Sequence, residues 1–393
     1  MELRYRKILA IMISATIALI TLLTLLISPT KILGGFVKGF IDAPEGSTIL
    51  QRVEYVFRSE DYRMNEFIVI HDPSVHAYGG IQRLLHKTLI NDTENQVLKL
   101  NNGYLAFKND GFSDFSKLKE YLFDLKDVCD ETGSRLLFVH KNSKDTEDPT
   151  LLPAFYPYCV SSNFSEVRPE LEANGIPVLD LAEQIEKEGL DKYSLFYKTD
   201  HHWIPQTGLW VSRIISDLLN QEFDLGLKTE LMEPQQYCVE NYPRSYLGSQ
   251  GQRVGALYAG IDDFAVVYPR FETHYEVEYC DSRKVYSGDF RDTFLFEKYL
   301  TPNKLLNRDA TAYMTYMNGN HSLVRVANKQ LEDGKTALVI MDSYGCVVAP
   351  YLSTVFKKMD CIDIRSYTET VEQYIRENQP DVVIYCISTY QKG

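Results

Sequence analysis

The sequence predicts an α/β fold built on a doubly wound parallel sheet. Short apolar runs alternate with segments of helical periodicity from about residue 100 to residue 222, and the alternation returns near residue 335. Runs of this length and composition are typical of strands that are buried on both faces. Because strands separated by single helices require parallel crossovers, we expect about five parallel strands, two in the first stretch and three in the second.

The first stretch begins with a helix and contains two strands. Apolar side chains recur at helical spacing from Phe115 to Val128, with Ser113 as the expected N-cap, and Gly133 ends this helix. The elements expected after it are a strand over 135–140, a helix over 166–173, a strand over 176–181 and a helix that begins at Pro205.

The second stretch supplies the other three strands. In order, we expect a strand over 336–341, a helix over 347–356, a strand over 359–364, a helix over 368–378 and a strand over 382–387. Residues 223–328 separate the two stretches. Runs 264–268 and 274–279 alternate as strands do, and a turn over 281–284 leads toward Val285. We expect this mostly β or irregular insertion to lie above the sheet.

The N-terminus has the pattern of a membrane anchor. Residues Ile8 to Ile27 form 20 positions without a charge, and a helix of that length spans ~30 Å, the thickness of a hydrocarbon core. Arg4, Arg6 and Lys7 precede it, which favours a cytoplasmic N-terminus and a chain exported beyond it. A removed signal peptide and a buried core helix are the alternatives; the length and the lack of a small-x-small cleavage site favour a retained single-pass anchor in the cell membrane.

These patterns divide the chain into five segments. Residues 1–30 are the anchor, 31–100 a stalk and N-terminal cap, 101–222 the first part of the α/β domain, 223–328 the insertion and 329–393 the second part of the domain. A net charge of −13 argues against binding nucleic acid through a broad basic face. The seven cysteines include no CxxC pair, which excludes zinc ribbons and thioredoxin-type sites.

Two remote segments carry the chemistry of a serine nucleophile. Asp200 and His202 are two residues apart, so in an extended chain both side chains point the same way. Ser343 follows an expected strand at the carboxyl edge of the sheet, where ligands bind and helix N-termini point their amides. We expect Ser343 to be the nucleophile, His202 its general base and Asp200 the acid that orients the base. The alternative is that Ser343 only caps the following helix.

A metal site competes for the same acidic and imidazole side chains. Asp200, His201 and His202 are all ligand types, but adjacent histidines in a strand diverge, and the chain lacks an HExxH motif. We therefore predict neither a metal nor a cofactor. His201 is expected to face away from the other two and to serve packing or a backbone hydrogen bond.

Several residues are candidates for holding an oxyanion or the substrate. The N–H of Ser343 itself is one donor, and Gly319 and Asn320 lie in a flexible segment before the nucleophile strand. Arg253, inside the glycine-rich stretch 248–255, could supply a positive donor, and Tyr344 adjoins the nucleophile. For both segments a plain turn is the competing interpretation. The glycine-rich stretch is not a dinucleotide fingerprint, because GxGxxG is absent and no βαβ unit surrounds it.

These motifs resemble a known family. Tyr197 to Trp203, followed by Gln206-Thr207-Gly208, is similar to the DHHW family and to the wider group of alginate O-acetyltransferase-like SGNH proteins of the AlgX and AlgJ type. The strand and serine over 338–344 resemble the same group. Further segments similar to the family are 247–255, Asp262-Asp263, Gly319-Asn320 and Asp363-Ile364-Arg365. The resemblance as a whole covers roughly residues 100 to 393.

The resemblance implies an SGNH-like domain in circularly permuted order, with the acid and base before the serine. It implies the same roles for Ser343, His202 and Asp200. Met341 stands where ordinary SGNH hydrolases have a glycine, so one backbone oxyanion donor does not carry over. The implied activity is O-acylation, usually acetylation, of an exported polysaccharide through an acyl-serine. The implied acyl donor partner is a membrane-bound O-acyltransferase.

Two other functions fit the same residues. A carbohydrate esterase or deacetylase would use the same triad and differ only in whether water reaches the acyl-enzyme. A noncatalytic surface protein would use the fold to bind glycan, and this alternative gains if Ser343 and His202 lie far apart.

Overall fold

The computed structural model describes residues 71–91, 96–108, 112–141, 143–144, 148, 150–154, 156, 161–300 and 311–387. Before residue 71 it describes only positions 15, 19, 22, 26, 40, 46–53 and 55. The chain divides into two compact units, Met1–His86 and Lys87–Gly393. The first contains helix α4 (His71–Leu84).

The predicted membrane anchor falls in the first unit. Of Ile8 to Ile27, only Ala15, Leu19, Leu22 and Leu26 are described, each as helical, and the rest of the segment lies outside the described residues. Most of the predicted stalk lies outside them as well. Among the helices that the structure does describe, none has both the length and the apolar character needed to cross a membrane.

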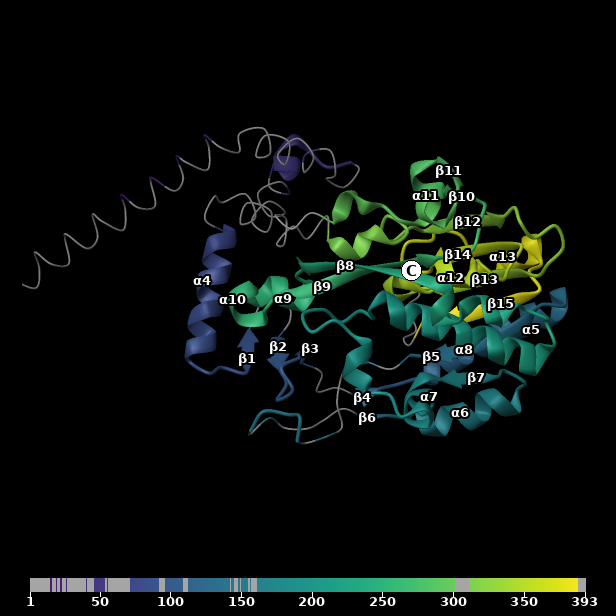
Figure 1. Ribbon diagram of the computed structural model, residues 1–393, viewed down its shortest axis with the longest axis horizontal. Helices are drawn as coiled ribbons and strands as arrows, with labels where there is room; N and C mark the ends of the chain where they lie inside the picture. Colours follow the sequence, from purple (N-terminus) through teal and green to yellow (C-terminus); the bar gives the residue numbers. More distant parts are fainter. Residues whose placement is uncertain are drawn as a thin grey trace, which may run out of the picture. The chain divides into compact units, whose positions relative to one another are not determined.

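The second unit is built around one mixed sheet of eight strands, in the order β11-β10-β12-β14-β13-β15-β5-β7 (Figure 1). Five of them are parallel neighbours: β14 (Lys358–Asp363), β13 (Thr336–Met341), β15 (Val382–Cys386), β5 (Arg135–His140) and β7 (Val178–Asp180). Two come from the first stretch of sequence and three from the second, as predicted, so the prediction of an α/β fold is confirmed.

Successive residues of the parallel strands pack against opposite faces, as the pleat requires. Leu137 and Val139 contribute to one core cluster, with α8 (Pro205–Phe223) and α12 (Ala349–Leu352). Leu136 and Phe138 contribute to the other, with α5 (Ser116–Thr132) and α13 (Val371–Asn378). Helix α6 (Phe164–Ala173) belongs to the α5 face and α7 (Leu181–Glu188) to the α8 face. Apolar runs in these strands therefore reflect burial on both sides.

The insertion differs from its predicted position. Strands β10 (Tyr275–Tyr279), β11 (Lys284–Gly288) and β12 (Leu323–Asn328) do not lie above the sheet but extend it, antiparallel, from the edge of β14. The reason is that β14 would otherwise expose an unpaired edge, and β12 covers it. Only β8 (Tyr237–Tyr246) and β9 (Asp262–Pro269) form a separate two-stranded sheet.

A small sheet precedes the α/β domain. Strands β1 (Leu89–Asn91), β2 (Gln96–Lys99) and β3 (Leu105–Phe107) are antiparallel neighbours. Val97 and Leu105 pack with Val254 and Tyr258 in a core cluster of their own. The glycine-rich stretch 248–255 forms helix α9 (Ser249–Val254) rather than the plain turn that was the alternative, and α10 (Ala256–Ala259) follows it. The small sheet therefore packs against these two helices.

Two local predictions were wrong. Ser113 lies in the short strand β4 (Phe112–Ser113), and Phe115 is the N-cap of α5. The side chain of Asn163, from a distant turn, accepts the N–H of Phe115, the N-cap residue. The helix predicted over 347–356 is shorter: a 3₁₀ turn, η8 (Ser343–Val347), precedes α12, which has Pro350 in its first turn.

Candidate active site

Helix α8 brings the two chemical segments together. A β-carbon at Gly208 would lie 1.9 Å from the carbonyl oxygen of Val347, so the helix backbone contacts the turn that follows Ser343. The hydroxyl of Ser212 also donates to the carbonyl of Val348 at 3.0 Å. Because His202 precedes the first turn of α8, this contact places it beside Ser343.

Ser343 lies at the junction between β13 and η8, at the carboxyl edge of the parallel strands. Asp342 is the N-cap of this turn: its side chain accepts the N–H of Tyr344 at 3.0 Å, and its carbonyl accepts that of Gly345 at 2.9 Å. Within the described part of the chain, no acceptor bonds to the N–H of Ser343. That amide is therefore the one left to face a substrate oxygen.

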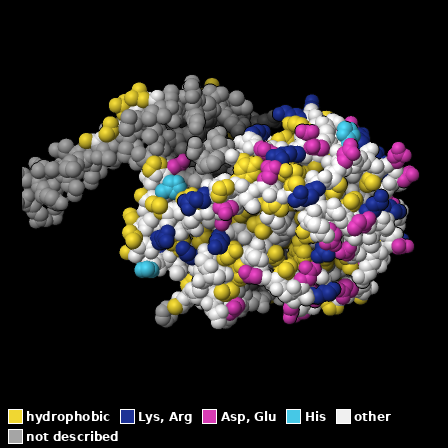
Figure 2. Space-filling model, in the orientation of Figure 1, with side chains coloured by type: hydrophobic (Ala, Val, Ile, Leu, Met, Phe, Trp, Pro, Cys, Tyr) yellow, Lys and Arg dark blue, Asp and Glu magenta, His cyan; other side chains and the backbone are white. Residues whose placement is uncertain are grey.

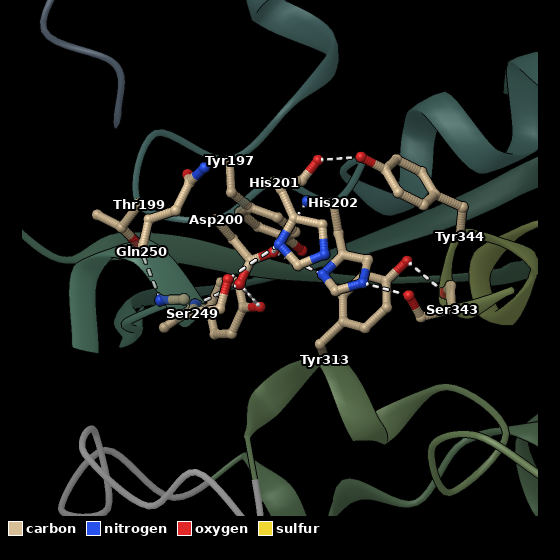
Figure 3. A network of polar contacts seen from close by, with 12 residues as sticks. Tyr197, Thr199, Asp200, His201, His202, Ser249, Gln250, Tyr313, Ser343 and Tyr344 are labelled. Atoms are coloured by element: carbon tan, nitrogen blue, oxygen red, sulfur yellow. Dashed lines mark hydrogen bonds and ion pairs between the residues drawn. The ribbon is translucent and has the colours of Figure 1, made fainter. Parts of the chain in front are cut away.

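Three side chains form an unbroken row (Figure 3). The hydroxyl of Ser343 lies 2.7 Å from Nε2 of His202, and Nδ1 of His202 lies 2.5 Å from Oδ1 of Asp200. A proton on Nδ1 donates to the carboxylate, so Nε2 is left to accept from the serine hydroxyl; this tautomer follows from the partners. The row has the atoms and spacing of a serine nucleophile, its general base and an orienting acid.

The segment that carries the acid and base is a bent loop rather than the predicted extended chain. Phe196 and Trp203 form an antiparallel bridge that closes it, and the N–H of Tyr197 donates to the carbonyl of His202 at 3.3 Å. Asp200 also accepts the backbone N–H of His202 at 2.8 Å, in the manner of an Asx turn. The turn, not strand alternation, therefore brings the carboxylate to the imidazole.

The bend also changes the place of His201. Its ring does not face away, as expected, but lies beside that of His202 with centroids 3.9 Å apart, and its Nδ1 lies 2.9 Å from the hydroxyl of Ser249. Burial, with the neighbouring His202, lowers the pKa of His201 to about 3. The ring is therefore neutral near neutral pH.

Asp200 is buried and fully engaged. Its Oδ2 accepts the hydroxyl of Tyr246 at 2.9 Å and the N–H of Ser249 at 2.5 Å, and its Oδ1 accepts both bonds from His202. Burial opposes ionisation, but the electrostatic interaction with the two neighbouring histidines and the hydrogen bonds from His202 outweigh it and hold the pKa of Asp200 well below its usual value. The acid is therefore a carboxylate over the working pH range.

The close histidines reopen the question of a metal. One ligand atom each from Asp200, His201 and His202 lies within 4.8 Å of the others. The argument from diverging histidines no longer applies. The Nδ1 of His202 and Oδ1 of Asp200, however, are already bonded to each other, and the Nδ1 of His201 lies within hydrogen-bond distance of Ser249. A metal would have to break the row to bind here, so the donor set does not fit a resident ion.

The row opens into a pocket of about 300 Å³. Gly319, Asn320 and Arg253 line it, together with Ser343 and His202. The side-chain oxygen of Asn320 accepts from Cys346 at 3.4 Å, which leaves the amide NH₂ for the pocket. The N–H of Gly319 is bonded to Tyr316 at 3.1 Å, so this glycine does not offer that donor. A larger pocket, of about 420 Å³, lies at the opposite edge of the sheet near Thr336 and Lys358 and contains none of these residues.

The other two candidates differ in position. The guanidinium of Arg253 lies over the ring of Phe107, 5.6 Å from its centroid, at the side of the pocket. Tyr344 does not line the pocket. Its hydroxyl donates to the carbonyl of His201 at 2.6 Å, and its ring packs edge-on against the buried Trp203 at 4.8 Å. Tyr344 therefore connects the loop of Ser343 to the loop of His201 and His202, outside the pocket.

A second nucleophile type in the pocket is inert. Cys346 lines it, but burial raises the pKa of its thiol to about 12. A thiolate is the reactive form, so the Cys346 thiol does not compete with the hydroxyl of Ser343.

Sequence reasoning missed four residues around the row. Tyr313 stacks on the His202 ring with centroids 4.2 Å apart and donates to the carbonyl of Ser343 at 3.2 Å. The hydroxyl of Tyr246 donates to Asp200, and Lys141 and Lys144 contact the two loops that carry the row. The chain has 27 tyrosines, and no sequence motif distinguishes Tyr313 or Tyr246 from the others. Lys141 directly follows the buried strand β5 and Lys144 lies three residues later, and this position was their one signal in the sequence.

Comparisons with known proteins agree with the α/β fold. Residues 103–257 match a family model described as the SGNH hydrolase-like domain of the acetyltransferase AlgX. No curated protein matches the chain. A DHHW family protein from Eubacterium siraeum is similar in structure, with a TM-score of 0.56 and 16% identity over 76% of this chain and 92% of that one.

A second similar structure is that of Bacillus cereus PatB1 with a sulfonyl adduct. Its TM-score is 0.59 and its identity 18%, over 75% of this chain and 95% of that one. At such identities the structures show a shared fold. Together with the family match, they confirm the predicted resemblance to DHHW and AlgX-type SGNH proteins.

Proposed function

We propose that the chain is a membrane-anchored, extracytoplasmic O-acyltransferase, acting through an acyl-serine intermediate on a cell-surface polysaccharide. Its acyl group is most simply acetyl. The observation that carries the proposal is the row from Ser343 through His202 to Asp200, which opens into a pocket of about 300 Å³. The 2.7 Å distance between Ser343 Oγ and His202 Nε2 also removes the argument that would favour a noncatalytic glycan-binding protein.

The first half-reaction acylates the enzyme. The Oγ of Ser343 attacks the acyl carbonyl carbon while Nε2 of His202 takes the hydroxyl proton. The oxyanion that forms accepts from the N–H of Ser343 and the amide of Asn320. The bond from the acyl carbon to the donor group then breaks, and His202 gives its proton to the departing group.

The second half-reaction regenerates the serine. His202 takes the proton of a carbohydrate hydroxyl, and the hydroxyl oxygen attacks the acyl-serine carbonyl. The bond between the acyl carbon and Ser343 breaks, and His202 returns the proton to Oγ. Asp200, held ionised by its surroundings, stabilises the imidazolium in both steps.

The location and the donor follow from the N-terminal segment and from chemistry. Twenty uncharged residues after Arg4, Arg6 and Lys7 support an anchor with the catalytic domain outside the membrane. Coenzyme A thioesters are cytosolic, so an enzyme outside needs its acyl groups handed through the membrane. A membrane-bound O-acyltransferase is the partner that we propose for this step.

Partitioning of the acyl-enzyme tests transfer against hydrolysis. The full-length protein is supplied with an activated acetyl ester, with and without candidate oligosaccharides. We expect acetylated oligosaccharide to form and acetate release to fall when an acceptor is present. Equal acetate release in both samples would favour a carbohydrate esterase with the same three residues. The Ser343→Ala variant is the control and should neither release acetate nor acetylate the oligosaccharide.

A further inference from the structure

Two lysines follow strand β5 and lie three residues apart. The side chain of Lys141 is 8% exposed, and Lys144 is 3% exposed. Buried lysines are uncommon because an ammonium is costly to desolvate, so their partners indicate why they are retained. The partners belong to the two loops that carry the row of Ser343, His202 and Asp200.

Lys144 contacts the loop of the base and acid. Its ammonium donates to the carbonyls of Asp200 at 2.6 Å, Tyr197 at 2.9 Å and Lys198 at 3.3 Å. A fourth oxygen, the side-chain amide of Gln250 in α9, accepts at 3.0 Å. Three N–H groups therefore serve four oxygens, with the longest bond shared. Carbonyls that converge in this way repel one another unless donors lie between them, and the Lys144 ammonium supplies those donors.

Lys141 contacts the loop of the nucleophile. Its ammonium forms an ion pair with Asp342, the residue before Ser343. It also lies over the ring of Tyr344, the residue after Ser343, 4.1 Å from the centroid. Both neighbours of the nucleophile are thus fixed by one cation. Burial opposes ionisation of Asp342, but Lys141 outweighs it and lowers the pKa of that carboxyl.

We propose that Lys141 and Lys144, here called the lysine brace, are positioning residues that fix the distance between Ser343 and His202. Each lysine holds one of the two loops, and because both lysines follow the end of strand β5, their positions relative to the sheet set the spacing of the loops. The brace touches neither substrate nor the reacting atoms. This inference rests on the proposed function for its kinetic consequence, but its geometric consequence is independent of any activity.

Chemical rescue tests the brace. In the full-length Lys144→Ala protein, the rate of Ser343 acylation by an activated acetyl ester should fall on the order of 100-fold, the cost of a misplacement of about 1 Å. The apparent affinity for the ester should be unchanged. Methylammonium should enter the space left among the four oxygens and restore about tenfold or more of the rate.

Two variants control this experiment. Lys144→Met should lose as much rate as Lys144→Ala but should not respond to methylammonium, because the methionine side chain fills the space. Lys119→Met removes a surface ion pair, at 2.7 Å to Glu170, and should leave the rate unchanged. Lys141→Met should also acylate slowly, without rescue by methylammonium. Wild-type rates in folded Lys141→Met and Lys144→Met would overturn the proposal, as would a failure of methylammonium to raise the rate of folded Lys144→Ala.

A spectroscopic measurement separates the brace from the proposed function. The short bond from His202 Nδ1 to Asp200 should give a far-downfield proton resonance in the wild type. We expect this signal to be lost in Lys144→Ala and regained with methylammonium, even if the wild type is never acylated. Lack of acylation in the wild type would contradict the proposed function alone. A signal that persists in Lys144→Ala, or failure of every brace variant to fold, would contradict the brace, since the lysines would then serve stability only.

Discussion

The backbone of Gly248 lies directly against the side chain of Asp200. A β-carbon at position 248 would lie 2.1 Å from the Cβ of Asp200 and 2.4 Å from its Oδ2. The close approach lets the next N–H, that of Ser249, donate to the carboxylate at 2.5 Å. A glycine is needed here for space, because its φ lies outside the left-handed region that favours glycine.

Gly248→Ala should therefore displace the acid of the row. We expect acylation of Ser343 to slow on the order of 100-fold, since a shift of about 1 Å in a supporting group has that effect. Gly334→Ala is the matched control: its β-carbon would meet the Cβ of Lys357 at 3.2 Å and no atom closer, and Gly334 does not line the pocket. Equal rates in the two variants would show that Asp200 tolerates displacement.

Tyr313 should contribute through its ring and its hydroxyl separately. Tyr313→Phe keeps the stack on His202 and loses the bond to the Ser343 carbonyl, so we expect about a fivefold loss of activity, near 1 kcal/mol. Tyr313→Leu loses both and should cost about tenfold or more. Phe290→Leu disrupts a comparable stack, on Tyr351 with centroids 5.7 Å apart, and should lower only thermal stability. Steady-state kinetics of the folded variants would contradict the account if Tyr313→Leu retained full activity.

Asn320 should stabilise the oxyanion. Removing one such donor typically costs about 10² to 10³ in kcat, so Asn320→Ala should lose activity in that range with little change in KM. Asn318→Ala is the control: its side-chain oxygen accepts from Tyr299 at 2.8 Å, and it does not line the pocket. A loss confined to KM would assign Asn320 to substrate binding instead.

His201 should make stability fall in mild acid. Its pKa is about 3 in the folded chain against an ordinary 6.5, so between these values the unfolded chain binds a proton that the folded chain does not. The free energy of unfolding therefore rises with pH across this window and is lost as pH falls through it. Urea unfolding at pH 7 and pH 5 should show a smaller loss in His201→Gln than in the wild type. The exposed His274→Gln should behave as the wild type, and an unchanged pH dependence in His201→Gln would contradict the shift.

Much of the sheet could be predicted because its strands are buried on both faces. The predicted strands over 135–140 and 336–341 coincide with β5 and β13. Successive residues in each of these strands pack alternately into the two core clusters. Strand β12 could not be assigned in the same way. Its place in the sheet depends on pairing with β14. The paired residues are more than 30 positions apart in the sequence, so no local pattern predicts the contact.

The residues of the candidate site likewise fall into those that local sequence predicts and those that only the folded chain brings into place. Asp200, His202 and Ser343 are predictable because residue type and sequence position express their chemistry. The position of His201 was mispredicted because the Asx turn at Asp200 overrides strand alternation. Tyr313 and Tyr246 act through contacts made only in the folded chain, and their sequence neighbours give no signal.

The most direct test of the central claim is the mass of the enzyme after reaction with an activated acetyl ester. The account predicts one added acetyl group, located on Ser343 by peptide mapping, absent from Ser343→Ala and formed far more slowly in His202→Ala. Wild-type protein that gains no mass under these conditions, or gains it equally in Ser343→Ala, would contradict it.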